Sequence, residues 1–333
     1  MYTRRDFGKV ALAALPAAQS LARPNSNFGG VQIGIIAPYS FRGMPGDADS
    51  LLDNIVALGL SAVEMQSPPV EAFAGAPVSM GPPPGRRPGA AGPGGPGGGP
   101  ARGRGRRELT PEEQAERRAA AEALSKWRLS TSMDKFTQLR KKYEDAGVAI
   151  QLVKFGLGPD TPDDEVDYCF QVAKTLGCRG ITCEPPLSAT KRLGQFAEKH
   201  NILLAYHGHA NVTDPEAFAR PQSWEQAFSY SKYNGANIDI GHFTAGNSKS
   251  PAEFIKKYHD RITNLHLKDR KVDQGANMPW GEGDTQIKDI LRMVQREKWD
   301  MMGTIELEYP VPEGSDVMTE LRKCVQYCKN ALT

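Results

Sequence analysis

The sequence predicts a (β/α)8 TIM barrel, and three observations lead to this prediction. Short apolar runs alternate with helical patterns along most of the chain, in about eight βα units over roughly 300 residues, which is the size of a TIM barrel. Several late apolar runs end on carboxylate or imidazole side chains, as expected where parallel strands open into a reaction cavity. The first βα turn, residues 37–41, lacks the glycine-rich phosphate loop typical of the competing doubly wound sheet.

The individual elements follow in a regular order. Short, largely apolar runs predict strands at 31–37, 62–66, 149–155, 180–184, 203–207, 238–241, 262–267 and 303–307. A helical pattern follows each strand, at 48–58, 133–146, 163–176, 190–199, 224–233, 251–258, 287–298 and 317–329. Glycines stand after several of these helices, where C-terminal caps are expected: Gly59, Gly147, Gly177 and Gly235.

Residues 1–27 are expected to be a signal peptide and linker outside the fold. Arg4 and Arg5 open a twin-arginine signature, and an apolar stretch follows at residues 10–21. The stretch is too short for a convincing membrane span, so no stable membrane insertion is expected. The signature predicts transient contact with the twin-arginine export machinery and a periplasmic or secreted protein. An uncleaved amphipathic terminus is the alternative.

Residues 28–333 are predicted to form one barrel domain, interrupted by an insertion at 68–130 after the second strand. Residues 81–107 contain only Gly, Pro, Ala and Arg and cannot bury apolar area, which predicts disorder. Thr110 and Pro111 then open a helical pattern. A solvated spacer is favoured over an arginine-mediated contact with an anionic surface, because no aromatic residue interleaves the arginines. With a net charge of only +2, no nucleic-acid partner is expected.

Candidate metal ligands stand at or near the carboxyl ends of predicted strands, where a barrel builds its active site. Glu184 ends the fourth strand, Asp239 lies in the sixth, His266 is at the end of the seventh and Glu306 at the end of the eighth. Three carboxylates and one imidazole favour Mn²⁺, Co²⁺ or Mg²⁺ as one divalent ion, with Zn²⁺ as a further option. A hydrogen-bonded structural role is the alternative for each residue. The metal site is favoured because four of the six histidines fall on this rim: His207, His209, His242 and His266.

These residues also predict a reaction. Glu184 and Glu306, flanking a hydroxycarbonyl compound, could remove and return a proton beside a carbonyl polarised by the metal. We therefore expect an isomerase or epimerase that acts on a sugar or keto-sugar through an enediolate. A dehydratase or lyase acting on a keto-sugar or inosose is the runner-up, because it shares the proton abstraction and then expels a β-leaving group. A non-catalytic carbohydrate-binding protein is the remaining alternative.

The late motifs resemble those of the xylose-isomerase-like sugar phosphate isomerase/epimerase TIM-barrel family. The similar segments are Tyr206-His207-x-His209, Asp239-Ile-Gly-His242, His266-Leu-Lys-Asp269 and Ile305-Glu306. The resemblance covers about residues 31–67 and 131–333. It implies a divalent metal held by Glu, Asp, His and Glu, with two glutamates exchanging a proton next to a carbonyl. It also implies that His242 and Arg270 contact the substrate.

One position departs from the family pattern. In the ketose-epimerase branch the first metal glutamate ends the fifth strand, where this chain has His207. Either Glu184, one strand earlier, replaces that glutamate, or His207 and His209 enter the coordination shell. Outside the shell, both imidazoles are expected to contact the substrate. Glu64, at the end of the second strand, is a reserve candidate for the catalytic base.

Further residues refine the expected function. The endonuclease branch needs additional histidines on early strands, whereas the second and third strands here end at Glu64 and at Lys154-Phe155, which disfavours phosphoester hydrolysis. Trp280 is a candidate sugar-stacking platform in a loop over the site, with a packing role as the alternative. Because an exported enzyme rarely meets phosphorylated metabolites, we expect an unphosphorylated carbohydrate substrate. A homo-oligomer is compatible with the sequence.

Overall fold

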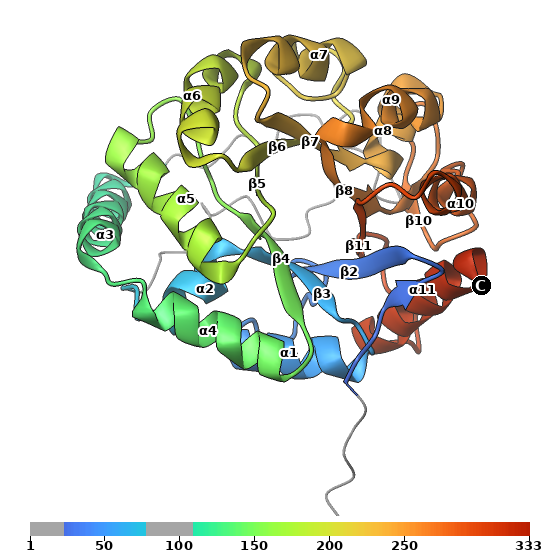
Figure 1. Ribbon diagram of the computed structural model, residues 1–333, viewed down its shortest axis with the longest axis horizontal. Helices are drawn as coiled ribbons and strands as arrows, with labels where there is room; N and C mark the ends of the chain where they lie inside the picture. The colour runs from blue at the N-terminus through green and yellow to red at the C-terminus, as the bar shows by residue number, and fades with distance from the viewer. Residues whose placement is uncertain (1–22, 78–108) are drawn as a thin grey trace, which may run out of the picture.

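A closed barrel of eight parallel strands forms the centre of the protein, which is described by a computed structural model over residues 23–77 and 109–333 (Figure 1). Pairing of β2 with both β3 and β11 closes the cylinder. The TIM-barrel prediction is therefore confirmed. In chain order the strands are β2 (Val31–Ala37), β3 (Ala62–Gln66), β4 (Ala149–Lys154), β5 (Gly180–Cys183), β6 (Leu203–His207), β7 (Asn234–Asp239), β8 (Ile262–Leu267) and β11 (Met302–Ile305).

Helices surround the barrel and cover its outer surface (Figure 1). The helices that follow the strands are α1 (Ala48–Ala57), α4 (Asp134–Asp145), α5 (Asp163–Leu176), α6 (Thr190–His200), α7 (Pro221–Tyr230), α9 (Ala252–Tyr258), α10 (Ile287–Glu297) and α11 (Val317–Leu332). α10 shows why they pack there: Ile287, Ile290, Leu291 and Val294 recur at helical spacing and are all buried. Gly177 ends α5 in the left-handed conformation, as the sequence predicts.

The main difference from the predicted elements lies after the sixth barrel strand. The sequence predicts a strand at 238–241, but β7 ends at Asp239 and α8 (Ile240–Asn247) begins at the next residue. The Asp239 side chain caps this helix by accepting a 2.7 Å hydrogen bond from the backbone N–H of His242. The apolar side chain of Ile240 suggests a strand residue, but the cap formed by Asp239 starts a helix at this position. As a result, His242 lies in the first turn of a helix.

Several short elements escape sequence analysis because they are too brief to show a period. β1 (Asn27–Phe28) pairs antiparallel with β2, and β9 (Asp269–Arg270) pairs with β10 (Asn277–Met278) in a small hairpin after β8. The turns η1 (Leu187–Ala189) and η2 (His259–Arg261) precede α6 and β8. The hairpin carries Arg270, which the family resemblance implies as a substrate contact.

The predicted insertion contributes two helices that dock on the barrel, α2 (Ser67–Phe73) and α3 (Pro111–Ser130). Thr110 and Glu113 form the capping box that starts α3. Near its other end, the guanidinium of Arg128 pairs with Glu71 of α2 and Glu165 of α5, both at 2.8 Å. These contacts hold the two inserted helices against α5.

Two predictions fall wholly or mainly on parts of the chain outside the described residues. They are the twin-arginine signal, of which residues 1–22 are not described, and the predicted disorder of residues 81–107. Among residues 23–77 and 109–333, no helix is both long enough and apolar enough to span a bilayer.

Replacing Arg128 with Met is expected to lower the free energy of unfolding by about 3 kcal/mol. The two carboxylates have side-chain exposures of only 5% and 10%, and the substitution leaves both without their cation. Urea denaturation measures the change. Lys141→Met is the matched control, because its pair with Asp145 is exposed, and it should cost less than about 1 kcal/mol. Equal losses in the two variants would contradict the assignment.

Candidate functional site

Four side chains from neighbouring strands converge inside the carboxyl-terminal mouth of the barrel. His207 ends β6, Asp239 ends β7, His266 belongs to β8 and Glu306 directly follows β11. All four are buried, and one ligand atom from each lies within 4.8 Å of the others. Three of these residues are predicted metal ligands, and His207 is the fourth member in place of Glu184, the two having been left as alternatives by the sequence. We call these four residues the central cluster.

His266 lies between two carboxylates at the floor of this cluster. Its Nδ1 is 2.7 Å from Oε2 of Glu306, and its Nε2 is 2.7 Å from Oε2 of Glu64. Burial alone would lower the pKa of His266, but the negative charges of Glu64 and Glu306 raise it to about 10. Without a metal ion, the imidazole is therefore an imidazolium that neutralises buried charge.

Lys268 brings a second positive charge into the cluster. Its Nζ lies 2.9 Å from Oδ2 of Asp239 and 3.0 Å from Oε2 of Glu306, and it also pairs with Glu308. Burial would lower the pKa of Lys268, but these carboxylates hold it well above its usual range. The pKa of Asp239 is raised to about 6, mainly by burial. Because the ammonium group contacts two cluster carboxylates, it competes with a metal ion for them.

Glu184 lies beside the central cluster, in a second group of charges. It pairs with Lys154 at the end of β4 and lies 3.3 Å from Nε2 of His209 and 4.0 Å from Nε2 of His207. Burial would raise the pKa of Glu184, but Lys154 and His209 hold it well below its usual range. Its side chain is 29% exposed, so it faces the opening of the barrel. Its predicted roles as metal ligand and acid–base group stay predictions.

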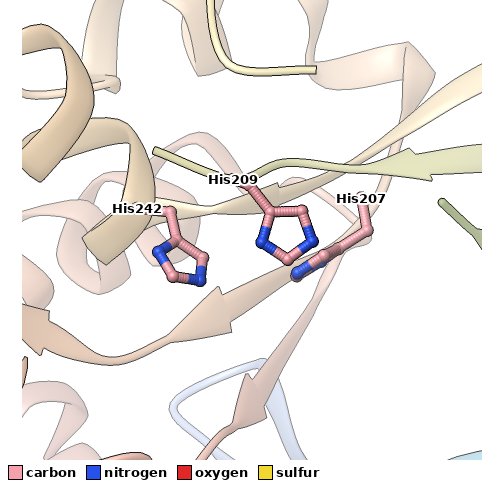
Figure 2. Close-up of side chains that lie close together, drawn as sticks. All are labelled: His207, His209 and His242. Carbon is pink, nitrogen blue, oxygen red and sulfur yellow. The ribbon is translucent and has the colours of Figure 1, made fainter. Parts of the chain in front are cut away.

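Three imidazoles line the rim of the mouth, with His209 between His207 and His242 (Figure 2). Their ring centroids are 4.9 Å apart for His207 and His209, and 5.1 Å apart for His209 and His242. Burial, more than any neighbouring charge, holds the pKa values of His207 and His242 well below the usual range. Both rings are therefore neutral near pH 7. Neutral imidazoles can both donate and accept hydrogen bonds, which suits substrate hydroxyl groups.

These three imidazoles form a poor second metal site because of the groups around His242. Its Nδ1 is 2.7 Å from a guanidinium nitrogen of Arg270, and its Nε2 is 3.2 Å from Nζ of Lys268. A metal ion bound to this ring would meet two positive charges at close range. The contact with Arg270 does join the two residues that the family resemblance implies as substrate contacts.

Trp280 packs near the last helix of the barrel. Its ring meets that of Tyr327 on α11 edge to face, with centroids 5.7 Å apart. The carboxylate of Asp269 holds the segment that follows by accepting hydrogen bonds from the backbone N–H groups of Gly281 and Gly283. These contacts match the packing alternative, and the sugar-stacking role of Trp280 stays a prediction.

The central cluster fits a divalent cation. Two imidazoles and two carboxylates are donors that Mn²⁺, Co²⁺ and Zn²⁺ accept. Oδ2 of Asp239 is buried and makes no hydrogen bond, although the Lys268 ammonium lies 2.9 Å away. This oxygen is compensated by the ammonium group alone, and a bound cation would take its place.

Comparison with known proteins identifies the family. The family model for the xylose isomerase-like TIM barrel matches residues 118–328. The chain belongs to this family. No curated protein sequence matches it significantly.

Several solved structures share the fold. A sugar phosphate isomerase/epimerase from Parabacteroides distasonis has a TM-score of 0.54 at 14% identity, over 97% of this chain and 99% of its own. The apo form of 3-keto-D-glucoside 4-epimerase from E. coli has a TM-score of 0.56 at 9% identity, over 90% and 99%. A probable 3-DHS dehydratase from Bacillus anthracis has a TM-score of 0.57 at 10% identity, over 89% and 97%. At such low identities the likeness shows the fold alone.

Three charged residues of the site have no firm role among the predictions from the sequence. Lys268 and Lys154 received none, and Glu64 was only a reserve candidate for the base. The position of Lys268 could have been predicted from the alternation of side chains along an extended segment. His266 and Lys268 are two residues apart, and alternate residues of a strand share a face. Glu64 is the middle residue of β3 and points into the barrel, so an analysis of strand ends gives it little weight.

Cation binding at the central cluster should release about one proton. Because the pKa of His266 in the folded protein, about 10, exceeds its ordinary value, the bound proton stabilises the cation-free fold. This contribution is full below about pH 6.5 and is lost as the pH rises through the folded value. A cation must displace that proton, so affinity should rise about tenfold per pH unit between about pH 7 and 9. Calorimetry with Mn²⁺ in buffers of different ionisation enthalpy counts the protons, and a flat affinity would exclude His266 as a ligand.

Proposed function

We propose that the protein is a divalent-metal-dependent isomerase or epimerase of a sugar or keto-sugar. The observation that carries the proposal is the buried central cluster in the mouth of the barrel. Beside this cluster lies a further carboxylate, that of Glu184, which can act together with Glu306. Family membership supports a site at this position, since TIM-barrel enzymes place their chemistry at the carboxyl ends of the strands. Proton transfer next to a carbonyl is the chemistry that suits two such carboxylates.

His207, Asp239, His266 and Glu306 would hold the cation, which supplies polarisation of a substrate carbonyl when bound. Glu306 is suited to carry a proton between substrate carbons. Burial would raise the pKa of Glu306, but Lys268 and His266 hold it well below its usual range, so it is ionised and able to accept a proton. It is buried with 5% of its surface exposed, which excludes most water from the step.

Glu184 is placed to serve the opposite side of the substrate. Oε1 of Glu184 is 4.0 Å from Nε2 of His207. Because His207 and Glu306 belong to the same cluster, the carboxylates of Glu184 and Glu306 border the same space. Lys154 and His209 keep Glu184 ionised and oriented. Neutral His242 would orient substrate hydroxyls between the two carboxylates. Removal of a proton by one carboxylate and its return by the other gives epimerisation.

A dehydratase is the second candidate, and the position of His209 favours it. This imidazole is 47% exposed and lies 3.3 Å from Oε2 of Glu184. An imidazole paired with a carboxylate can protonate a leaving hydroxyl group. The same proton abstraction would then end in β-elimination. Elimination products from a keto-sugar or inosose, without epimers, would favour this candidate.

The cellular location bears on the substrate. We propose export through the twin-arginine pathway, on the basis of Arg4 and Arg5 and the apolar stretch that follows them. An exported enzyme would act on an unphosphorylated carbohydrate. Fusion of residues 1–27 to a reporter that functions only after export tests this proposal, with Arg4→Lys, Arg5→Lys as the control that should abolish the signal. Reporter activity confined to the cytoplasm would contradict it.

Glu306→Gln is expected to reduce turnover by about 10²-fold to 10⁴-fold, the contribution of one acid–base group. The measurement is solvent deuterium exchange by Mn²⁺-loaded protein in D₂O, with a panel of ketoses, keto-glycosides and inososes. Exchange at the carbon next to the carbonyl should be seen with the native protein and lost in the variant. The matched control is Glu320→Gln, a buried glutamate on α11 that bonds Tyr309, and it should keep full exchange. Retained turnover in Glu306→Gln would place the chemistry elsewhere, and inertness of the native protein toward the whole panel would favour a binding protein.

A further inference from the structure

We infer that Glu64 is a positioning residue, which holds the proton of His266 on Nε2 and so presents Nδ1 as the ligand atom for the cation. This inference rests on the proposed metal site. It gives a role to a fully buried carboxylate of the barrel interior that the proposed reaction does not use.

The inference begins with the place of Glu64. The residue is in the middle of β3, pairs in register with Leu152 of β4, and is fully buried. Its carboxylate reaches across the inside of the barrel to side chains of β5, β7 and β8. It therefore lies below the central cluster, where it contacts Nε2 of His266 while Glu306 of the cluster contacts Nδ1.

Both oxygens of Glu64 are fully engaged. Oε1 accepts hydrogen bonds from Thr182 at 2.6 Å and from Asn237 at 3.3 Å, while Oε2 accepts from Asn264 at 2.8 Å and from His266 at 2.7 Å. A carboxylate has about four lone-pair positions, so none is left for a substrate proton or a metal ion. This excludes Glu64 as the base and leaves the orientation of His266 as its task.

The orientation of the Asn264 side-chain amide is fixed by two further hydrogen bonds. Its Nδ2 donates to Oγ1 of Thr304 as well as to Glu64, and its Oδ1 accepts from Thr263 at 2.8 Å. The amide is therefore oriented with its hydrogens toward Glu64, and the carboxylate is held from several sides. The hydrogen bonds from Thr182, Asn237 and Asn264 therefore fix the position of the Glu64 carboxylate relative to His266.

The consequence for His266 is a defined tautomer. In the cation-free protein both ring nitrogens carry protons, because each faces a carboxylate oxygen at 2.7 Å, Nε2 that of Glu64 and Nδ1 that of Glu306. Nδ2 of Asn237 also lies 3.1 Å from Nε2, but it donates to Oε1 of Glu64. Glu306 is a member of the central cluster and Glu64 is not, so a cation bound there displaces the proton on Nδ1 and leaves the one on Nε2. When the ring gives up its second proton, Nδ1 is left with a free lone pair on the side of Glu306. Without Glu64, the remaining proton could instead rest on Nδ1 as a hydrogen bond to Glu306, and the ligand atom would be blocked.

Carboxylates that orient a metal-bound histidine in this way typically change metal affinity about 10-fold to 100-fold. We therefore expect Glu64→Gln to bind Mn²⁺ and Zn²⁺ about 10-fold to 100-fold more weakly than the native protein, measured by competition with a fluorescent chelator. Glu320→Gln again serves as the matched control, because it also removes a buried carboxylate but should leave affinity unchanged. This readout needs no substrate and no turnover.

The outcomes separate the possible failures. Failure of the native protein to bind either metal ion would overturn both the proposed site and this inference. Native affinity in a folded Glu64→Gln would overturn this inference alone, and so would native affinity combined with lost turnover, which would make Glu64 an acid–base group.

A measurement on the native protein covers the case in which Glu64→Gln does not fold. Nitrogen NMR of the Zn²⁺-loaded protein, with ¹⁵N-labelled histidine, should show His266 protonated on Nε2 and coordinated through Nδ1. The opposite tautomer, with coordination through Nε2, would overturn the inference.

Discussion

Compensation of buried negative charge is the constraint on which the site depends. Glu64, Asp239 and Glu306 lie inside a barrel from which water is largely excluded, each with 5% or less of its surface exposed. Carboxylates in such surroundings persist as ions only beside positive charges and hydrogen-bond donors. The doubly paired imidazolium of His266 and the ammonium of Lys268 supply those charges. A divalent cation at the central cluster would take over this task, displacing a proton from His266 and competing with Lys268.

Strand register brings these charges together. Asp239 of β7 pairs with His266 of β8, which in turn pairs with Thr304 of β11, two residues before Glu306. Alternate residues of a strand share a face, so His266 and Lys268 occupy successive levels of the same wall. The barrel also joins β3 to the site from the far side, which lets Glu64 reach His266 across 202 positions of sequence. Closure of the cylinder is therefore a condition for assembling these side chains as well as for the fold.

The site divides into two levels with different physical character. The deep level contains charged groups that pair with each other and have little freedom to move. The rim carries the imidazoles of His209, which is 47% exposed, and His242, together with Glu184 and Lys154. Deep charges suit cation binding and proton transfer, whereas adaptable hydrogen-bonding groups at the rim suit recognition of hydroxyl groups.

The sequence by itself determined the barrel, the bounds of most strands, and three members of the central cluster. These features follow from local periods and from side chains at strand ends, which a linear reading detects. Tertiary structure alone decided that His207 joins the cluster while Glu184 lies beside it, that Lys268 enters between the carboxylates, and that Glu64 supports His266 from below. It also placed Trp280 against Tyr327. Each of these depends on the register of distant strands and on the reach of individual side chains, and neither quantity is written in the neighbouring sequence.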